Sequence, residues 1–100
     1  MGNGDQMNKS VLIVLVPDPD EGYSGFVPFL PGVVSQGESI EETFTNTEEA
    51  LRACVEEYVK NGMAVPFLPE NSIDRWGGGG TIEESIRNAA FKRYVDIEIP

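Results

Sequence analysis

The stretch at residues 20–46, DEGYSGFVPFLPGVVSQGESIEETFTN, decides the fold of this chain. It contains two turn signals, Asp-Glu-Gly at residues 20–22 and Pro-Gly at residues 31–32. Glycine tolerates positive φ and proline fixes φ, so both sites predict chain reversals between neighbouring antiparallel strands. The stretch therefore predicts a meander with strands at residues 23–27 and 33–36.

A long helix is predicted at the end of this stretch. Ser39 and Glu42 form an S-x-x-E capping box, in which the serine hydroxyl accepts from the amide of Glu42 and the glutamate accepts from the amide of Ser39. Gly62 suits the C′ position that follows such a helix. Apolar residues then recur at spacings of three and four and predict one stripe facing the sheet: Ile40, Phe44, Leu51, Cys54, Val55, Tyr58 and Val59.

The segment before the stretch predicts a central strand. Residues 11–16, VLIVLV, form a continuous apolar run rich in β-branched residues, and the run ends at Pro17. Because side chains alternate along a strand, both faces of this one are apolar, and a single helix covers only one of them. We expect a homodimer or larger homo-oligomer to cover the other face; the alternative is that a second helix folds over it.

The C-terminal third predicts an insertion, a short helix and a last strand. Residues 67–80, FLPENSIDRWGGGG, predict a flexible Gly-rich insertion, in which Trp76 either anchors a partner or holds the insertion against the domain. Thr81 and Glu84 repeat the capping box and predict a helix ending near residue 91 or 92. Residues 94–99, YVDIEI, alternate as a half-buried strand does.

The predicted fold class is α/β, with a small sheet in the order 3-2-1-4 and the long helix on one face. A strand reached through helices is normally parallel to its neighbour, so we expect the last strand to lie parallel to the first and the sheet to be mixed. One hundred residues suffice for a single domain, which we place at residues 10–100 after a disordered polar tail at residues 1–9.

The amino-acid composition limits the classes of function that this chain can have. The net charge of −10, from 17 acidic and 7 basic residues, repels nucleic acid and favours basic protein partners. No apolar run is long enough to span a bilayer, and residues 1–10 lack the pattern of a signal peptide, so we expect a cytoplasmic protein without membrane contact. Cys54 is the single cysteine, which permits no internal disulfide.

Catalytic and metal sites are not predicted. The chain has no histidine, which excludes Ser-His-Asp and Cys-His arrangements and imidazole-based metal sites. Phe29 stands where a calcium loop beginning at Asp18 needs its last ligand, and the glycine run at residues 77–80 lacks the P-loop lysine. We expect no catalytic residue, no metal and no cofactor.

Several spaced motifs resemble those of the HicB family of type II antitoxins. They are DEGY at residues 20–23, FVP at 26–28, LPG at 30–32, VSQG at 34–37 and IEE at 40–42, followed by Asn46 and Ala50. The resemblance covers residues 10–66; Phe29 departs from it where the family often has an acid, and Val33 where it often has cysteine. It implies part of the ribonuclease H topology, but the leading strand lacks the carboxylate that two-metal nucleases place there.

The resemblance implies an antitoxin that binds and inhibits a small basic ribonuclease toxin of the HicA type. Such an inhibitor can offer carboxylates in place of RNA phosphates, although carboxylates at these positions also suit solvated turns and helix caps. The alternative function is an orphan homo-oligomeric binding module with the same fold. The candidate partner-binding residues are Asp18, Asp20, Glu21, Tyr23, Glu38, Glu41 and Glu42.

The resemblance also bears on DNA binding. Many family members continue into a DNA-binding module after the last strand, whereas this sequence ends at Pro100. Together with the acidic composition, this leads us to expect no DNA binding by the chain alone.

Overall fold

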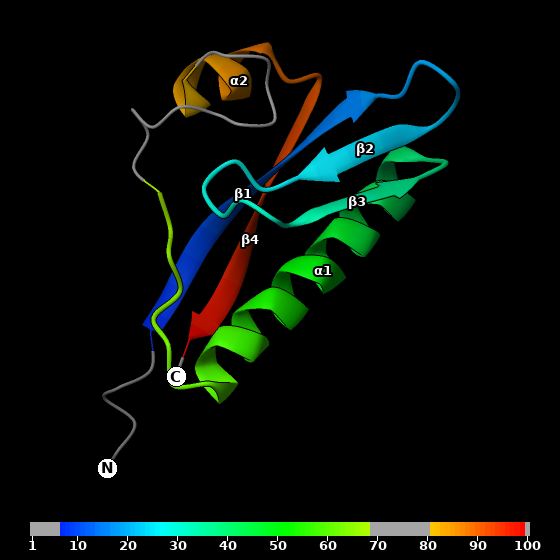
Figure 1. The fold of residues 1–100 in the computed structure, drawn as a ribbon. Helices are drawn as coiled ribbons and strands as arrows, with labels where there is room; N and C mark the ends of the chain where they lie inside the picture. The colour runs from blue at the N-terminus through cyan, green and yellow to red at the C-terminus, as the bar shows by residue number, and fades with distance from the viewer. Residues whose placement is uncertain (1–6, 69–80, 100) are drawn as a thin grey trace.

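Four strands form one sheet in the order β3-β2-β1-β4, and a long helix lies along one face of it (Figure 1). The computed structural model describes residues 7–68 and 81–99. The order and the single long helix confirm the predicted fold class. In chain order the elements are β1 (Met7–Pro17), β2 (Tyr23–Phe26), β3 (Val34–Gly37), α1 (Ile40–Lys60), α2 (Ile82–Asn88) and β4 (Phe91–Ile99).

The direction of β4 differs from the prediction. All three pairs of neighbouring strands are antiparallel, and Met7 of β1 lies opposite Ile99 of β4. The prediction of a parallel β4 and a mixed sheet was therefore wrong. Helix α1 ends near the start of β1, whereas α2 and the start of β4 lie at the opposite end of the sheet (Figure 1). The end of α1 and the start of β4 thus lie at opposite ends of the sheet, and a strand that begins at this opposite end runs antiparallel to β1.

Strand β1 is longer than its apolar run. It begins at Met7, so residues 7–9 belong to the sheet and not to the tail in which we had placed them. Ser10 Oγ donates a hydrogen bond of 2.8 Å to Asp96 Oδ1 of β4, and Lys9 Nζ lies 4.9 Å from the ring centroid of Phe67. Polar residues extend the strand because β4 supplies backbone partners regardless of side-chain type.

The main core lies between the sheet and α1. The predicted apolar stripe of α1 faces it: Phe44, Leu51 and Val55 are buried, and the rest of the stripe is half-buried. The strands and loops contribute the other buried residues of this cluster, which are Val11, Ile13, Leu15, Val27, Leu30, Val33, Val95 and Ile97. Alternate residues of β1 and β4 therefore point toward α1, as strand periodicity requires.

The second face of β1 is buried within the same chain. Leu12 and Val14 are 2 % and 0 % exposed. Helix α2 lies on this side of the sheet, opposite α1, and its first residue Ile82 is fully buried (Figure 1). Leu12 and Val14 are therefore covered within the chain itself, which is consistent with the alternative of a second helix over this face, and an exposed apolar strand no longer argues for an oligomer.

Helix α1 approaches β2 and β3 closely at two glycines. Thr43 and Thr47 of α1 are completely buried there, and their hydroxyls donate to the carbonyls of Ser39 and Thr43, each at 2.6 Å. A Cβ on Gly37 would lie 2.7 Å from Thr43 Oγ1, and a Cβ on Gly25 would overlap Thr47 Oγ1. The absence of side chains at these glycines therefore permits the distance between α1 and the sheet. This contact was not predicted from the sequence.

The C-terminal elements begin and end differently from the prediction. Helix α2 ends at Asn88, not at residue 91 or 92, because Phe91 already pairs with Leu15 in the sheet. Within the predicted insertion, Phe67 packs against the core and the amide of Leu68 donates to the carbonyl of Phe29 at 2.8 Å. The rest of that insertion, with Trp76 and the glycine run at residues 77–80, lies outside the described residues.

The helix caps follow the predicted chemistry with one change. Ser39 Oγ accepts from the amide of Glu42 at 3.1 Å, and Gly62 follows the helix at φ +70°. The carboxylate of Glu42 accepts from the amide of Glu38 at 2.7 Å, however, and not from that of Ser39 as predicted. In α2 both hydrogen bonds of the capping box are present, between Thr81 and Glu84. No helix in the described ranges is long and apolar enough to cross a membrane.

Replacing Ser39 with alanine is expected to lower the free energy of unfolding by about 1 kcal/mol, because the amide of Glu42 loses its side-chain acceptor. Urea unfolding followed by circular dichroism measures this change. Thr45→Ala, at an exposed position of the same helix, is the control and should not lower the stability. Equal stabilities of the Ser39→Ala and Thr45→Ala proteins would contradict the capping role.

Candidate functional site

An acidic hollow of about 460 Å³ opens where the β1–β2 turn, the end of β3 and the start of α1 meet. Five carboxylates line it, and lysine and arginine are absent from its lining among the described residues. Like charges gathered in one concave surface attract cationic groups. The lining consists of Asp18, Asp20, Glu21, Tyr23, Gln36, Gly37, Glu38, Glu42 and Asn46.

The β1–β2 turn positions the first group of carboxylates. The amide of Asp18 donates to the carbonyl of Gly22 at 2.9 Å, and the amide of Asp20 donates to Asp18 Oδ1 at 2.9 Å. Gly22 adopts φ +79°, and a Cβ there would overlap the carbonyl oxygen of Gly37. The turn therefore lies directly against the end of β3, which brings its carboxylates beside those at the start of α1.

The start of α1 positions the second group. One oxygen of the Glu42 carboxylate accepts from the amide of Glu38, which fixes the side chain at the entrance to the helix. One turn further on, Asn46 Nδ2 donates to the carbonyl of Gln36 in β3 at 2.9 Å. These two contacts connect side chains of α1 with backbone groups at and just after the end of β3, so this wall of the acidic hollow is held by side-chain-to-backbone hydrogen bonds.

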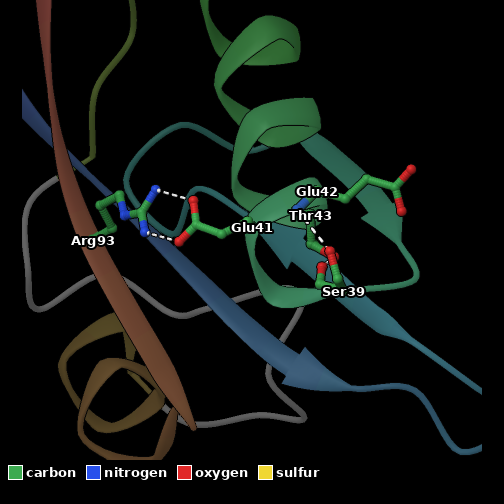
Figure 2. Close-up of polar contacts among 5 residues, drawn as sticks. All are labelled: Ser39, Glu41, Glu42, Thr43 and Arg93. Atoms are coloured by element: carbon green, nitrogen blue, oxygen red, sulfur yellow. Dashed lines mark hydrogen bonds and ion pairs between the residues drawn. The ribbon is translucent and has the colours of Figure 1, made fainter.

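Glu41 lies apart from the other predicted residues. Its carboxylate accepts two hydrogen bonds from the Arg93 guanidinium of β4, at 3.3 and 2.6 Å. Figure 2 shows Glu41 directed toward Arg93, while Glu42 extends to the other side of the helix beside Ser39. The structure thus brings six of the seven predicted partner-binding residues together in the acidic hollow and places Glu41 outside it.

Arg93 also lowers the pKa of Glu41. The hydrogen bonds from its guanidinium and its positive charge both favour the ionised carboxylate. The Arg93 guanidinium lies 4.2 Å from the ring centroid of Phe44, so it connects β4 to α1 through a carboxylate and an aromatic ring together.

Removing the guanidinium with Arg93→Gln is expected to raise the pKa of Glu41 toward its ordinary value. A carboxyl whose pKa is lower in the folded than in the unfolded state adds stability above the unfolded-state pKa, and that stability is lost as the pH falls through the folded-state pKa. Carboxyl-detected NMR titration measures the shift. The control is Arg87→Gln, whose guanidinium pairs with Glu83 instead; a Glu41 titration that moves in this control, or stays fixed in Arg93→Gln, would contradict the assignment.

Tyr23 and the side-chain amides of Gln36 and Asn46 also line the acidic hollow. Tyr23 is half-buried and its ring meets that of Phe91 edge-to-face, with centroids 5.9 Å apart, so its position is fixed by the core. Gln36 and Asn46 were not predicted as site residues. The spacing of Asn46, four residues after Glu42 on one helix face, was a signal that would have found it.

The acidic hollow is suited to bind cationic groups. Among the described residues, no three His, Cys, Asp or Glu side chains are placed to hold a metal ion together. Burial raises the pKa of the Cys54 thiol, which lies on α1 against the core, so the neutral thiol is favoured there. The carboxylates and amides that line the acidic hollow offer ionic and hydrogen-bonding recognition.

Comparison with known proteins gives a family match over most of the chain. The family model described as HicB-like antitoxin of bacterial toxin-antitoxin system matches residues 11–79. A UPF0150 protein of Helicobacter pylori is 55 % identical over 42 residues, which cover 41 % of this chain and 58 % of that protein. A UPF0150 protein of Synechocystis is 42 % identical over 52 residues, which cover 51 % of this chain and 75 % of the relative. The chain thus spans little more than half the length of the Helicobacter relative.

Two solved structures share the fold. The N-terminal domain of the Burkholderia pseudomallei antitoxin HicB superposes with a TM-score of 0.64 at 28 % identity, over 89 % of this chain and 98 % of that domain. A chain of a HicA3 and HicB3 toxin-antitoxin complex superposes with a TM-score of 0.54 at 17 % identity, over 92 % of this chain and 96 % of that one. The second similarity shows the fold alone.

Proposed function

Because the chain belongs to the HicB-like antitoxin family of bacterial toxin-antitoxin systems, we propose that it binds and inhibits a small basic ribonuclease toxin of the HicA type. The similarity to the N-terminal domain of an antitoxin HicB, over nearly all of that domain, supports an antitoxin role. One of the structural neighbours is described as a toxin-antitoxin complex, which is consistent with a protein toxin as the partner.

The acidic hollow is the observation that supports the inhibitory surface. A ribonuclease binds the RNA backbone through cationic side chains, and five carboxylates in one concave surface offer those side chains an alternative to phosphates. Asp20, Glu21 and Glu38 are exposed at its rim, where they are available to a partner. Half-buried Tyr23 adds an aromatic side chain of fixed position, a residue type enriched in binding hot spots.

The proposed role is one of binding and not of catalysis. Blocking a toxin requires only that the chain occupy the toxin's RNA-binding surface. A toxin that cleaves RNA acts in the cytoplasm, so the proposal implies that the chain is cytoplasmic. The net charge of −10 disfavours direct binding of the chain to nucleic acid. The second candidate function is an orphan homo-oligomeric binding module. It predicts that the chain forms no complex with a toxin, whereas the antitoxin proposal requires such a complex.

An RNA cleavage assay tests the proposal directly. The genes beside the one for this chain are first searched for a small basic ribonuclease, which is then purified and incubated with a model RNA while the chain is added in increasing amounts. We expect cleavage to stop near equimolar amounts, together with a stable complex on size-exclusion chromatography. Full RNA cleavage in the presence of excess chain would contradict inhibition, whether or not a complex forms.

A further inference from the structure

Helix α1 ends in a Schellman motif with Gly62 at its C′ position. The amide of Gly62 donates to the carbonyl of Val59 at 3.0 Å, and the amide of Met63 donates to the carbonyl of Tyr58 at 2.9 Å. Gly62 adopts φ +70°, the left-handed conformation that this motif requires. The motif turns the chain away from the helix at the surface, since residues 61–64 are all exposed.

The side chain of Asn61 completes this turn. Its Nδ2 donates to the carbonyl of Glu57 at 2.9 Å and to Glu57 Oε2 at 3.2 Å. Both hydrogen bonds need an amide, because an ionised carboxylate at position 61 has no hydrogen atom to donate. The end of α1 therefore depends on the side-chain amide of a residue that directly precedes a glycine.

An asparagine that precedes a glycine can lose its amide without an enzyme. The glycine backbone nitrogen, once deprotonated, attacks the asparagine Cγ; the N–Cγ bond forms, the Cγ–Nδ2 bond breaks, and Nδ2 takes up a proton and leaves as ammonia. Water then opens the cyclic imide at one of its two carbonyls and gives aspartate or isoaspartate. Glycine has no Cβ to obstruct the attack. The space beside Gly62 is open too, since no atom of the described residues lies within 4 Å of an added Cβ.

We propose that Asn61 is a site of spontaneous deamidation and that the reaction opens the end of α1. The turn restrains the reaction, because the Gly62 N–H and Asn61 Nδ2 both donate hydrogen bonds that must break first. Fraying of an exposed helix end costs little free energy, so the folded chain should react at most about tenfold more slowly than the unfolded chain. The reactants are the chain and water.

The product does not rebuild the turn. A carboxylate at position 61 loses both hydrogen bonds to Glu57, stands four residues after this like charge, and lies at the negative end of the helix dipole despite the neighbouring Lys60. In isoaspartate the backbone passes through the former side-chain carbon, so the amides of residues 62 and 63 are displaced from their acceptors. The following segment, in which Val65 and Phe67 pack against the core, then loses its fixed start.

This proposal does not depend on the antitoxin function. The acidic hollow lies at the start of α1, whereas Asn61 follows its last residue. Failure of the chain to inhibit a toxin would leave the deamidation proposal unchanged, and an intact Asn61 would leave the antitoxin proposal unchanged.

Peptide mapping of the aged protein tests the reaction. The folded chain and a urea-unfolded sample are incubated in mildly alkaline buffer, digested with an acid protease and analysed by fragment mass spectrometry. Fragmentation separates Asn61 from the second Asn-Gly pair, at residues 3–4. We expect conversion at Asn61 in both samples. An intact Asn61 in the folded chain, over a period in which a reaction about tenfold slower than that of the unfolded chain converts half of the protein, would overturn the proposal.

Variants at position 57 test the restraint on Asn61. Glu57→Ala removes the carboxylate acceptor of Nδ2, so deamidation should become about threefold faster. Glu57→Gln keeps an acceptor oxygen and should stay close to the wild-type rate, which separates the hydrogen bond from the charge. The matched control is Glu49→Ala, the same change at an exposed position earlier in α1. Equal rates in Glu57→Ala and Glu49→Ala would show that this hydrogen bond does not restrain the reaction.

Hydrogen exchange tests the structural consequence. Asn61→Asp reproduces one product, and ion-exchange chromatography isolates the naturally deamidated chain by its additional negative charge. In both proteins the amides of Gly62 and Met63 should exchange at least about threefold faster than in the wild type, because the turn that protects them opens. Thr45→Asp adds the same charge at an exposed position of α1 and should leave both amides unchanged. Wild-type exchange rates in both deamidated proteins would overturn the proposed opening of α1.

Discussion

Replacing Gly25 with alanine is expected to lower the free energy of unfolding by about 2–3 kcal/mol. The new Cβ would overlap Thr47 Oγ1 at a place where both residues are buried between β2 and α1. Adding a methyl group to a closely packed site forces side chains or backbone to move, at a cost of about 1–3 kcal/mol. The displaced hydroxyl also loses its hydrogen bond to the carbonyl of Thr43, which leaves a buried donor unsatisfied.

A double-mutant cycle in urea isolates this contact. Thr47→Ala removes the atom with which the Cβ collides, so Gly25→Ala should cost clearly less in the Thr47→Ala background than in the wild type. Thr45→Ala is the matched control, because Thr45 is exposed on the same helix and should leave the cost of Gly25→Ala unchanged. A Gly25→Ala protein as stable as the wild type would show that α1 and β2 do not approach as closely as the structure has it.

Neutralising the β1–β2 turn is expected to slow toxin association about tenfold. The variant Asp18→Asn, Asp20→Asn and Glu21→Gln removes three of the five carboxylates of the acidic hollow. Complementary charges accelerate association at low salt, so the variant should also show a weaker dependence on ionic strength. The asparagine at position 18 keeps an acceptor for the amide of residue 20, and the exposed charges of Asp20 and Glu21 contribute little to folding, so the stability should change little.

The matched control has the same net charge but an intact acidic hollow. It carries glutamine at positions 49, 56 and 57, three exposed glutamates of α1 that do not line the hollow. Surface plasmon resonance against the toxin at several salt concentrations separates the two variants. Equal association rates and equal salt dependence for both would eliminate the acidic hollow as the inhibitory surface and would leave the antitoxin proposal itself in place.

The strand order and the helix were predictable because local signals specified them. The turns at residues 20–22 and 31–32 fix β2 and β3 as neighbours of the preceding strand, and Ser39 and Gly62 mark the ends of α1. The direction of β4 was not predictable from such signals. It depends on how many times the chain crosses the sheet between α1 and β4, and residues 61–81 contain no periodicity that reveals this path.

The site was predictable in outline but not in detail. A meander returns the β1–β2 turn and the end of β3 to the same end of the sheet, so carboxylates near both should meet. Whether Glu41 or Glu42 faces the acidic hollow depends on one step of about 100° around the helix. Arg93, a residue of the last strand whose position the sequence did not reveal, pairs with Glu41 on the side away from the acidic hollow. The burial of Thr43 and Thr47 was equally hidden, because it follows from the close approach of the helix at Gly25 and Gly37.

The pairing of β1 with β4 determines when the chain can complete its folding during synthesis. Ser10 and Asp96, which meet in this ladder, are separated by 86 positions in the sequence. Contacts between such distant residues slow folding, because the entropy of closing a long loop is lost before the contact stabilises anything. In a nascent chain, the apolar strand β1 cannot pair with β4, the strand with which it shares the longest ladder, until residues 91–99 have been synthesised. Folding is thus completed only after β4 has been translated. If translation pauses or stops before β4, part of the apolar strand β1 stays exposed, where it can aggregate or be bound by chaperones and proteases.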